Sequence, residues 1–211
     1  MPNNRAEIST ALVPLDQSDG LMVEQQTEWH ESFTDFETEN RYLVYDPGGQ
    51  PVYVAEEEGG GILRMLTRSL MNSARPFTMH MFSVDGQPVG TMRRPFRFYF
   101  HRLEVFDEDG DHVGTVQKRW SVLRRKYALL DPQGEPVFEV VGPLLKPWTF
   151  DIFDGEHQIG RICKRWSGLG REILTDADAF GVEYAEDLEV EAKQMLLATV
   201  FLIDFLHFEN R

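Results

Sequence analysis

The chain has 211 residues, of which 42% are hydrophobic, and a net charge of −14. A chain of this length can bury a stable hydrophobic core without disulfide or metal cross-links. Its single cysteine, Cys163, excludes a disulfide framework and a thiolate metal cluster. The acidic balance argues against a nucleic-acid partner, because phosphate contacts need clustered Lys and Arg. The N-terminal residues lack the basic and apolar regions of a secretory signal. We therefore expect a protein of the cytoplasm.

Charge is distributed unevenly along the chain. Residues 1–60 carry a net charge of −11, residues 61–171 carry +5 and residues 172–211 carry −8. Two interpretations stay open. The basic middle forms a face that meets anionic lipid headgroups, or the acidic ends fold over it and neutralise it.

In chain order, residues 1–20 are polar and aperiodic, which predicts a disordered tail. Residues 21–36 fit a short amphipathic helix or an edge strand. Five hairpins follow, each an alternating apolar run on either side of a turn that contains Asp and Gly. These hairpins cover residues 41–57, 79–92, 102–116, 127–141 and 150–162. About ten strands of this kind favour an antiparallel sheet that closes into a barrel and so leaves no exposed edge.

The C-terminal residues 195–208, MLLATVFLIDFLHF, are apolar on nearly every face, so a helix here must lie in a protein core or in a membrane. Fourteen residues give a helix of about 21 Å, which is short of a bilayer core but matches the height of a small barrel. We therefore predict a core helix over 189–208 inside one domain that covers residues 21–211.

Several stretches together carry a family resemblance, namely FETENRYLVYDPGGQPVYVAEE, ARPFTMHMFSVDGQPVGTMRRPFRF, VVGP, IGRICKRWSG, REILTDADAFGVEYAEDLEVEAK and FLIDFLHFE. The chain resembles the phospholipid scramblase family, whose fold is shared with tubby-like and LURP-one-like proteins. The resemblance implies a mainly β fold: a closed antiparallel barrel of about twelve strands around a buried hydrophobic C-terminal helix. It also implies membrane association and energy-independent, calcium-stimulated movement of phospholipids between leaflets.

The chain departs from the better-known eukaryotic members in two ways. About twenty polar residues stand in place of a long Pro-rich N-terminal region, and the segment after Arg94 has no cysteine cluster for palmitoylation. Stable anchoring usually takes two membrane signals. We therefore expect a protein that is peripheral or weakly anchored at the inner face of the plasma membrane.

The acidic segment 176–187 matches the calcium site proposed for the family. Its ligands by position would be Asp176, Asp178, Phe180, Val182 and Asp187, which take positions 1, 3, 5, 7 and 12 of a twelve-residue loop. Phe180 offers no side-chain oxygen, and Asp187 is shorter than the usual bidentate Glu. The sequence supports a weak calcium site at most. The alternative is a β-turn in which Asp side chains accept hydrogen bonds from backbone N–H groups.

Basic and aromatic residues in the middle of the chain suggest contact with lipid. The candidates for a basic face that holds lipid headgroups are Arg93, Arg94, Arg97, Arg102, Arg124, Arg125 and Lys126. The alternative is a solvated surface with local ion pairs. Trp120 and Trp166 each follow a Lys-Arg pair, which suits an interfacial anchor, whereas strand alternation also suits buried core tryptophans.

No nucleophile elbow, zinc motif or phosphate-cradling loop occurs, so we do not expect a bond-breaking enzyme. One hypothesis is a scramblase-family protein that acts on membrane phospholipids. A second is a soluble tubby-like module that binds lipid headgroups or a protein and has no transport activity, and a third is a cytosolic scaffold. Because one short helix offers no polar path for a headgroup, scrambling would need a homo-oligomer or a locally thinned bilayer.

Overall fold

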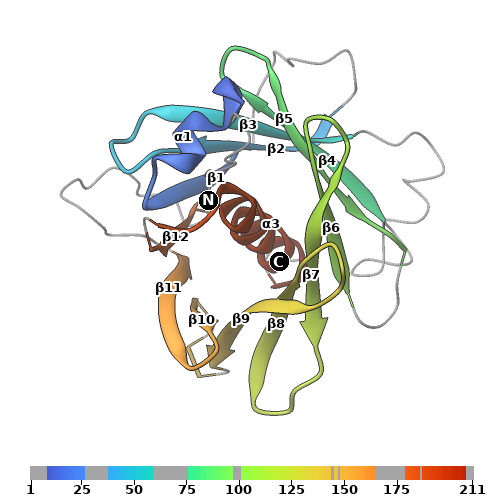
Figure 1. Ribbon diagram of the computed structural model, residues 1–211, viewed down its shortest axis with the longest axis vertical. Coiled ribbons are helices and arrows are strands. Elements are labelled where there is room, and N and C mark those ends of the chain that lie inside the picture. The colour runs from blue at the N-terminus through green and yellow to red at the C-terminus, as the bar shows by residue number, and fades with distance from the viewer. Residues whose placement is uncertain are drawn as a thin grey trace, which may run out of the picture.

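A computed structural model describes residues 9–26, 38–58, 76–96, 101–143, 145–146, 148–164, 179–185 and 187–207. These residues form twelve antiparallel strands that close into one barrel, in which β1 pairs with β12 and each other strand with its neighbours in sequence (Figure 1). The strands are β1 (Gly20–Gln26), β2 (Thr38–Tyr45), β3 (Pro51–Glu58), β4 (Phe77–Ser83), β5 (Pro88–Arg94), β6 (Arg102–Asp107), β7 (His112–Arg119), β8 (Arg124–Leu130), β9 (Pro136–Pro143), β10 (Thr149–Asp154), β11 (His157–Lys164) and β12 (Ala179–Tyr184). The predicted fold class is confirmed.

All five predicted hairpins are present, as β2–β3, β4–β5, β6–β7, β8–β9 and β10–β11. Their turns have a shared local cause. A glycine takes a positive φ in each turn, for example 87° at Gly110 and 89° at Gly134, a conformation that other residues adopt only with strain. In the β8–β9 turn the side chain of the first residue also accepts backbone N–H groups: Asp131 Oδ1 accepts from Gln133 N at 3.0 Å and from Glu135 N at 2.8 Å.

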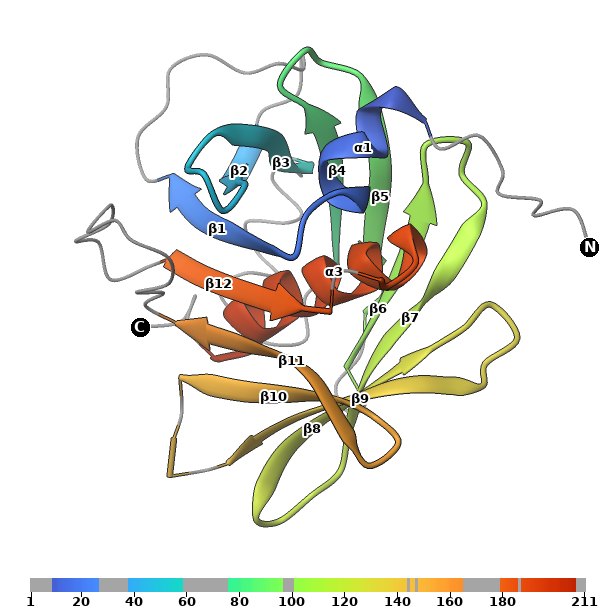
Figure 2. The same cartoon turned by 60° about the vertical axis from the view of Figure 1, so that its left-hand side comes forward.

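Helix α3 (Val190–His207) lies inside the barrel, with strands around it (Figure 2). Its apolar residues from Val190 to Phe205 are buried on every side, so the prediction of a core helix is confirmed. Leu196, Leu197, Leu202 and Ile203 are fully buried. Gly114 of β7 lets the helix approach the wall, because a Cβ at this position would lie 2.3 Å from Met195 Sδ.

The N-terminal segment differs from the predicted disordered tail over the residues that the structure describes. A 3₁₀ turn (Thr10–Leu12) continues into a short helix, α1 (Val13–Asp16), which lies beside one end of α3 (Figure 2). Leu12 and Leu15, three residues apart, are buried on the side facing the core. The prediction was wrong here because a polar composition concealed these two apolar anchors.

The structure also decides between helix and strand for the segment after α1. Of the two alternatives for residues 21–36, strand is correct for Gly20–Gln26. This strand is not an edge, since β1 pairs with β12 on one side and β2 on the other. The domain therefore begins before residue 21.

Among the described residues, no helix combines the length and the apolar character needed to cross a membrane.

Candidate functional site

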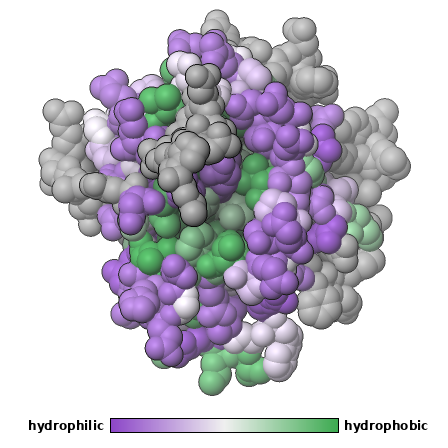
Figure 3. All heavy atoms as spheres, viewed as in Figure 1, coloured by the Kyte–Doolittle hydropathy of each residue, from purple (hydrophilic) through white to green (hydrophobic). Residues whose placement is uncertain are grey.

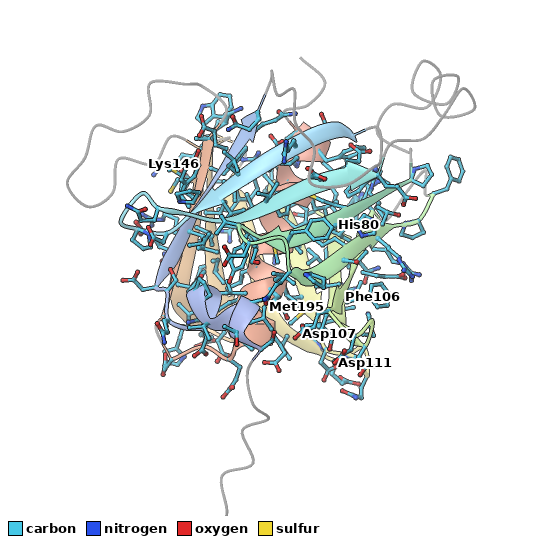
Figure 4. The ribbon with its side chains drawn as sticks, turned by 90° about the horizontal axis from the view of Figure 1, so that it is seen from above. His80, Phe106, Asp107, Asp111, Lys146 and Met195 are labelled. Atoms are coloured by element: carbon cyan, nitrogen blue, oxygen red, sulfur yellow. The ribbon has the colours of Figure 1, made fainter. Side chains whose placement is uncertain are left out.

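The barrel has two unlike ends. The hairpin end carries the five tight turns described above. The loop end carries the β5–β6, β7–β8 and β9–β10 connections and the C-terminus of α3. Figure 4 labels Lys146 at the loop end and Asp107 and Asp111 at the hairpin end, on opposite sides of the molecule.

Exposed apolar side chains gather at the loop end. Seven large hydrophobic side chains are exposed among the described residues, and six of them lie in loops at this end. Trp120 is 80% exposed and Leu145 is 96% exposed. The six are Phe96, Trp120, Val122, Leu123, Leu145 and Trp148. Figure 3 shows hydrophobic side chains at the lower tip of the molecule, where Figure 1 places the β7–β8 loop.

The β7–β8 and β9–β10 loops lie next to each other, since β8 pairs with both β7 and β9. Arg125 joins them, because its guanidinium Nη2 donates a hydrogen bond to the Lys146 carbonyl at 3.1 Å. Arg119, Arg124 and Lys146 are exposed beside the apolar side chains. The two loops thus expose apolar side chains next to basic side chains.

The structure decides between the two interpretations of Trp120. Strand β7 ends at Arg119, so the alternation that would turn Trp120 inward stops one residue too early. The buried interpretation is wrong for Trp120, which stands in solvent in the β7–β8 loop. Trp166 lies outside the described residues.

The predicted basic residues do not form one outer face, because neighbours along a strand point to opposite sides of the wall. Arg93 is exposed while Arg94 is 2% exposed. On β8, Arg124 is exposed and Lys126 pairs with Glu139 at 2.9 Å, whereas Arg125 between them lies over the inward Phe150 ring at 4.3 Å. Arg102 pairs with Glu104 at 2.5 Å, and Arg97 lies outside the described residues.

The inward members meet further basic residues at the loop end, and we call Arg94, His101, Lys118, Arg125 and His207 the mouth cluster. Arg94 Nη2 lies 2.7 Å from His101 Nδ1. A guanidinium can only donate, so this ring nitrogen accepts. The backbone N–H of Lys118 donates to the His101 carbonyl at 2.8 Å. Adjacent strands β5, β6, β7 and β8 therefore bring these groups to one rim of the barrel.

Helix α3 brings the last member of the mouth cluster to the same place. His207 Nε2 and the Tyr127 hydroxyl share a hydrogen bond of 2.7 Å. Tyr127 is the register partner of Lys118 on the neighbouring strand. The C-terminal end of α3 thus faces the basic rim.

Burial and like charges shift the protonation of the cluster. Burial, then Arg94 and Lys118, lowers the pKa of His101 to about 4. Burial, then Lys118, Arg125 and His101, lowers the pKa of His207 to about 4. The pKa of Lys118 is also lowered, by burial and then by Arg125 and Arg94. Both histidines are therefore neutral at pH 7, and the cluster's positive charge rests on Arg94, Lys118 and Arg125.

The acidic segment 176–187 does not form a single loop. Residues 179–184 are strand β12, paired with β1 on one side and β11 on the other. Phe180 and Val182 are buried in the wall, and Asp187 is exposed beyond it. The EF-hand-like arrangement does not fit, because paired strand residues cannot wrap around an ion. Asp176 and Asp178 lie outside the described residues, and within the described ones no group of three His, Cys, Asp or Glu side chains is placed to hold a metal.

Comparison with known proteins adds to this geometry. The family model named Scramblase matches residues 1–210. The chain belongs to the scramblase family. It is 36% identical over 93% of its length to phospholipid scramblase 1 of Mus musculus, and 32% identical over 93% to phospholipid scramblase 2 of Homo sapiens. It spans 63% of the Mus musculus protein, which is less than two thirds of that relative's length, and 69% of the Homo sapiens protein.

A further relative is phospholipid scramblase family member 5 of Homo sapiens. It is 30% identical to this chain, and the match covers 93% of this chain and 76% of the relative's length. A solved X-ray structure of a protein from Arabidopsis thaliana matches 94% of this chain and 96% of its own, with 13% identity and a TM-score of 0.49.

Proposed function

We propose that this protein acts on phospholipids at an anionic membrane surface and docks there with its loop end. The observation that carries the proposal is the concentration of exposed apolar side chains beside basic ones at this end. Trp prefers the headgroup level of a bilayer, and each nearby Lys or Arg adds about 1 kcal/mol of attraction to an anionic surface. Burying one Leu or Val contributes roughly 1.5–3 kcal/mol. Several such side chains on two adjacent loops are enough for reversible peripheral binding.

We infer further that the docked protein moves phospholipids between leaflets without an energy source. The support is membership of a family whose relatives carry the name phospholipid scramblase. On this proposal it is a lipid-translocating protein that breaks no covalent bond, and it works at the inner face of the plasma membrane. Helix α3 is enclosed by the barrel and provides no path for a headgroup. Translocation would use the outer surface of several assembled copies or a bilayer thinned beneath them.

Calcium is a separate part of this proposal. Because Phe180 and Val182 belong to the barrel wall, a calcium ion would have to rely on Asp176, Asp178 and Asp187 without the carbonyl of Val182. Calcium enters the experiment below as a variable.

A second candidate is a tubby-like module that binds lipid headgroups or a protein partner without transport. The enclosure of α3 favours it, since a helix with fully buried Leu196, Leu197 and Ile203 cannot insert into a bilayer unless the barrel opens. A fluorescent-lipid assay in reconstituted vesicles separates the candidates. Both predict docking, and only the first predicts exchange between leaflets.

Flotation of the purified protein with vesicles tests the docking. Vesicles of phosphatidylcholine alone and with phosphatidylserine are compared, each with and without millimolar calcium. We expect binding to the anionic vesicles and a loss of at least about tenfold in the Trp120→Ser, Leu123→Ser, Leu145→Ser variant. Val84→Ser, which changes an exposed apolar residue at the hairpin end, is the matched control. Equal loss in the control, or a wild type that ignores anionic vesicles, would contradict docking by the loop end.

A further inference from the structure

Lys118 and Arg125 are the half-buried cations of the mouth cluster, and within the described residues neither has a carboxylate partner in an ion pair. None of the ion pairs within the described residues includes His101, Lys118 or Arg125. The nearby Glu139 is engaged with Lys126 on the outer side of the wall. Asp204, one turn before His207 on α3, accepts a hydrogen bond from the Tyr42 hydroxyl at 3.0 Å. Like charges brought together out of water raise the free energy of the folded state.

We propose that the mouth cluster binds a phosphate group, held directly by Lys118 and Arg125, with the cation of Arg94 and the neutral ring of His101 beside them. The proposal concerns the inward side of the barrel rim. It does not depend on the apolar loop tips or on docking to a membrane.

Packing orients the guanidinium groups for an anion. Arg125 Cζ lies 4.3 Å from the centroid of the Phe150 ring, and Arg94 Cζ lies 4.3 Å from that of Phe205. Stacking uses the face of a guanidinium and not its in-plane N–H donors. Arg125 Nη2 already donates to the Pro143 and Lys146 carbonyls at 3.4 and 3.1 Å. Arg125 Nε is buried and has no hydrogen-bond acceptor among the described residues. The rings hold these cations in place without neutralising their charge.

A phosphate fits this donor set better than a carboxylate or chloride. Its several oxygens accept from the planar Arg fork and from the Lys ammonium at once. Charge-assisted hydrogen bonds of this kind are about twice as strong as neutral ones. The lowered pKa of Lys118 reflects burial and the neighbouring Arg125 and Arg94, with no carboxylate among its causes. A bound phosphate would oppose all three effects and stabilise the fold.

The decisive experiment measures inorganic phosphate binding to the full chain at pH 7, with sodium chloride keeping the ionic strength constant. Isothermal titration gives the Kd, and the thermal midpoint gives the gain in stability. Lys118→Met removes the central charge and keeps the apolar stem. Lys126→Met is the matched control, because Lys126 lies on the neighbouring strand and points to the outer side.

We expect phosphate to raise the midpoint of the wild type and of Lys126→Met. Lys118→Met is expected to have a higher midpoint than the wild type without phosphate, because repulsion is relieved, and a Kd at least about tenfold weaker. A wild type that responds to phosphate no more than to chloride overturns the proposal, and this arm needs no variant to fold. Equal weakening by Lys126→Met, or a lower midpoint of Lys118→Met without phosphate, also overturns it.

A vesicle arm identifies where the phosphate comes from. Vesicles containing phosphatidic acid, which exposes a phosphate monoester, are compared with phosphatidylserine vesicles of equal charge. If the site takes a lipid headgroup, Lys118→Met weakens binding to phosphatidic acid more than to phosphatidylserine, and free phosphate competes. If the site takes free phosphate, Lys118→Met leaves vesicle binding unchanged but still weakens phosphate binding in the isothermal titration. The triple loop variant retains phosphate binding in either case, so failure of membrane docking is distinguishable from failure of this site.

Discussion

The two ends of the barrel use charged side chains in opposite ways. At the hairpin end, Asp46, Asp107 and Asp131 each accept backbone N–H groups of their own turn. These carboxylates are already satisfied by the fold. At the loop end, Lys118 and Arg125 face inward among other cations, and Trp120 and Leu145 face solvent.

This difference shows which end carries features that folding does not explain. The turns at the hairpin end use their acidic residues to fix chain reversal. The loop end retains charge and apolar surface beyond what the fold requires. The net charge of −14 therefore says little about the local potential at the loop end, where a basic surround lies beside exposed apolar groups.

The largest effect on the free energy of unfolding is expected at a lysine that is fully buried and hydrogen-bonded. Lys193 is 0% exposed, and its Nζ donates to the Asp16 and Ser18 carbonyls at 2.6 and 2.9 Å. Lys193→Met leaves both carbonyls unsatisfied and should lower the free energy of unfolding by about 2–4 kcal/mol. The exposed Lys146→Met at the loop end should change it by less than about 0.5 kcal/mol. Urea denaturation measures both, and equal effects would refute the contrast.

A smaller loss is expected at a hairpin turn. Asp131→Ala removes the acceptor of two backbone N–H groups and should cost about 1–2 kcal/mol of unfolding free energy. Asp109→Ala changes an exposed turn residue, whose own backbone N–H donates to Asp107, and serves as the control. Chemical denaturation of both variants decides the matter: similar values would mean that the Asp131 carboxylate does not hold the turn.

Local signals made most of the fold predictable. The five hairpins follow from Asp and Gly at fixed offsets in each turn, and α3 follows from an apolar run too short for a bilayer. The burial of Leu12 and Leu15 was missed because it depends on contacts with residues far away in the sequence. For example, the hydroxyl of Tyr53 accepts a hydrogen bond from the Leu15 backbone N–H at 2.9 Å. The acidic segment was misjudged because the strand pairing of residues 179–184 is long-range.

The site was less predictable than the fold for a related reason. Arg94 and Arg125 were recognised as basic candidates, but which side of the wall each faces depends on strand register. His101 and Lys118 join them through the pairing of the consecutive strands β5 to β8, and His207 joins them through the position of α3. Alternation offered one signal in advance, since Lys118 shares a face with the apolar Val116 and therefore points inward.

Acid should lower the free energy of unfolding through the two histidines of the mouth cluster. The pKa of His101 and of His207 is lowered to about 4 in the folded protein, against an ordinary value of 6.5. The unfolded chain therefore binds more protons as pH falls from about 6.5 towards 4, and the free energy of unfolding falls with it. The charged groups that act on these rings are Arg94, Lys118 and Arg125, and the Tyr127 hydroxyl shares a hydrogen bond with His207.

After allowance for solvent screening at these partly exposed rings, we expect a loss of about 1 kcal/mol between pH 7 and pH 5. Thermal unfolding across this range measures it. His207→Gln should flatten the dependence, whereas the exposed His157→Gln at the hairpin end should leave it unchanged. A wild type equally stable at both pH values would show that the two rings are not held neutral by the cluster.

The smallest effect on stability is expected at the exposed apolar loop tips. Val122 and Leu123 are 66% and 76% exposed, so replacing both with Ser removes little buried surface and should change the free energy of unfolding by less than about 0.5 kcal/mol. Val116→Ser on the same hairpin, where Val116 is 0% exposed, should cost at least about 2 kcal/mol. Urea denaturation of the two variants compares them. A large loss in the loop variant would mean that these side chains serve the fold, and their exposure would then no longer argue for an external apolar partner.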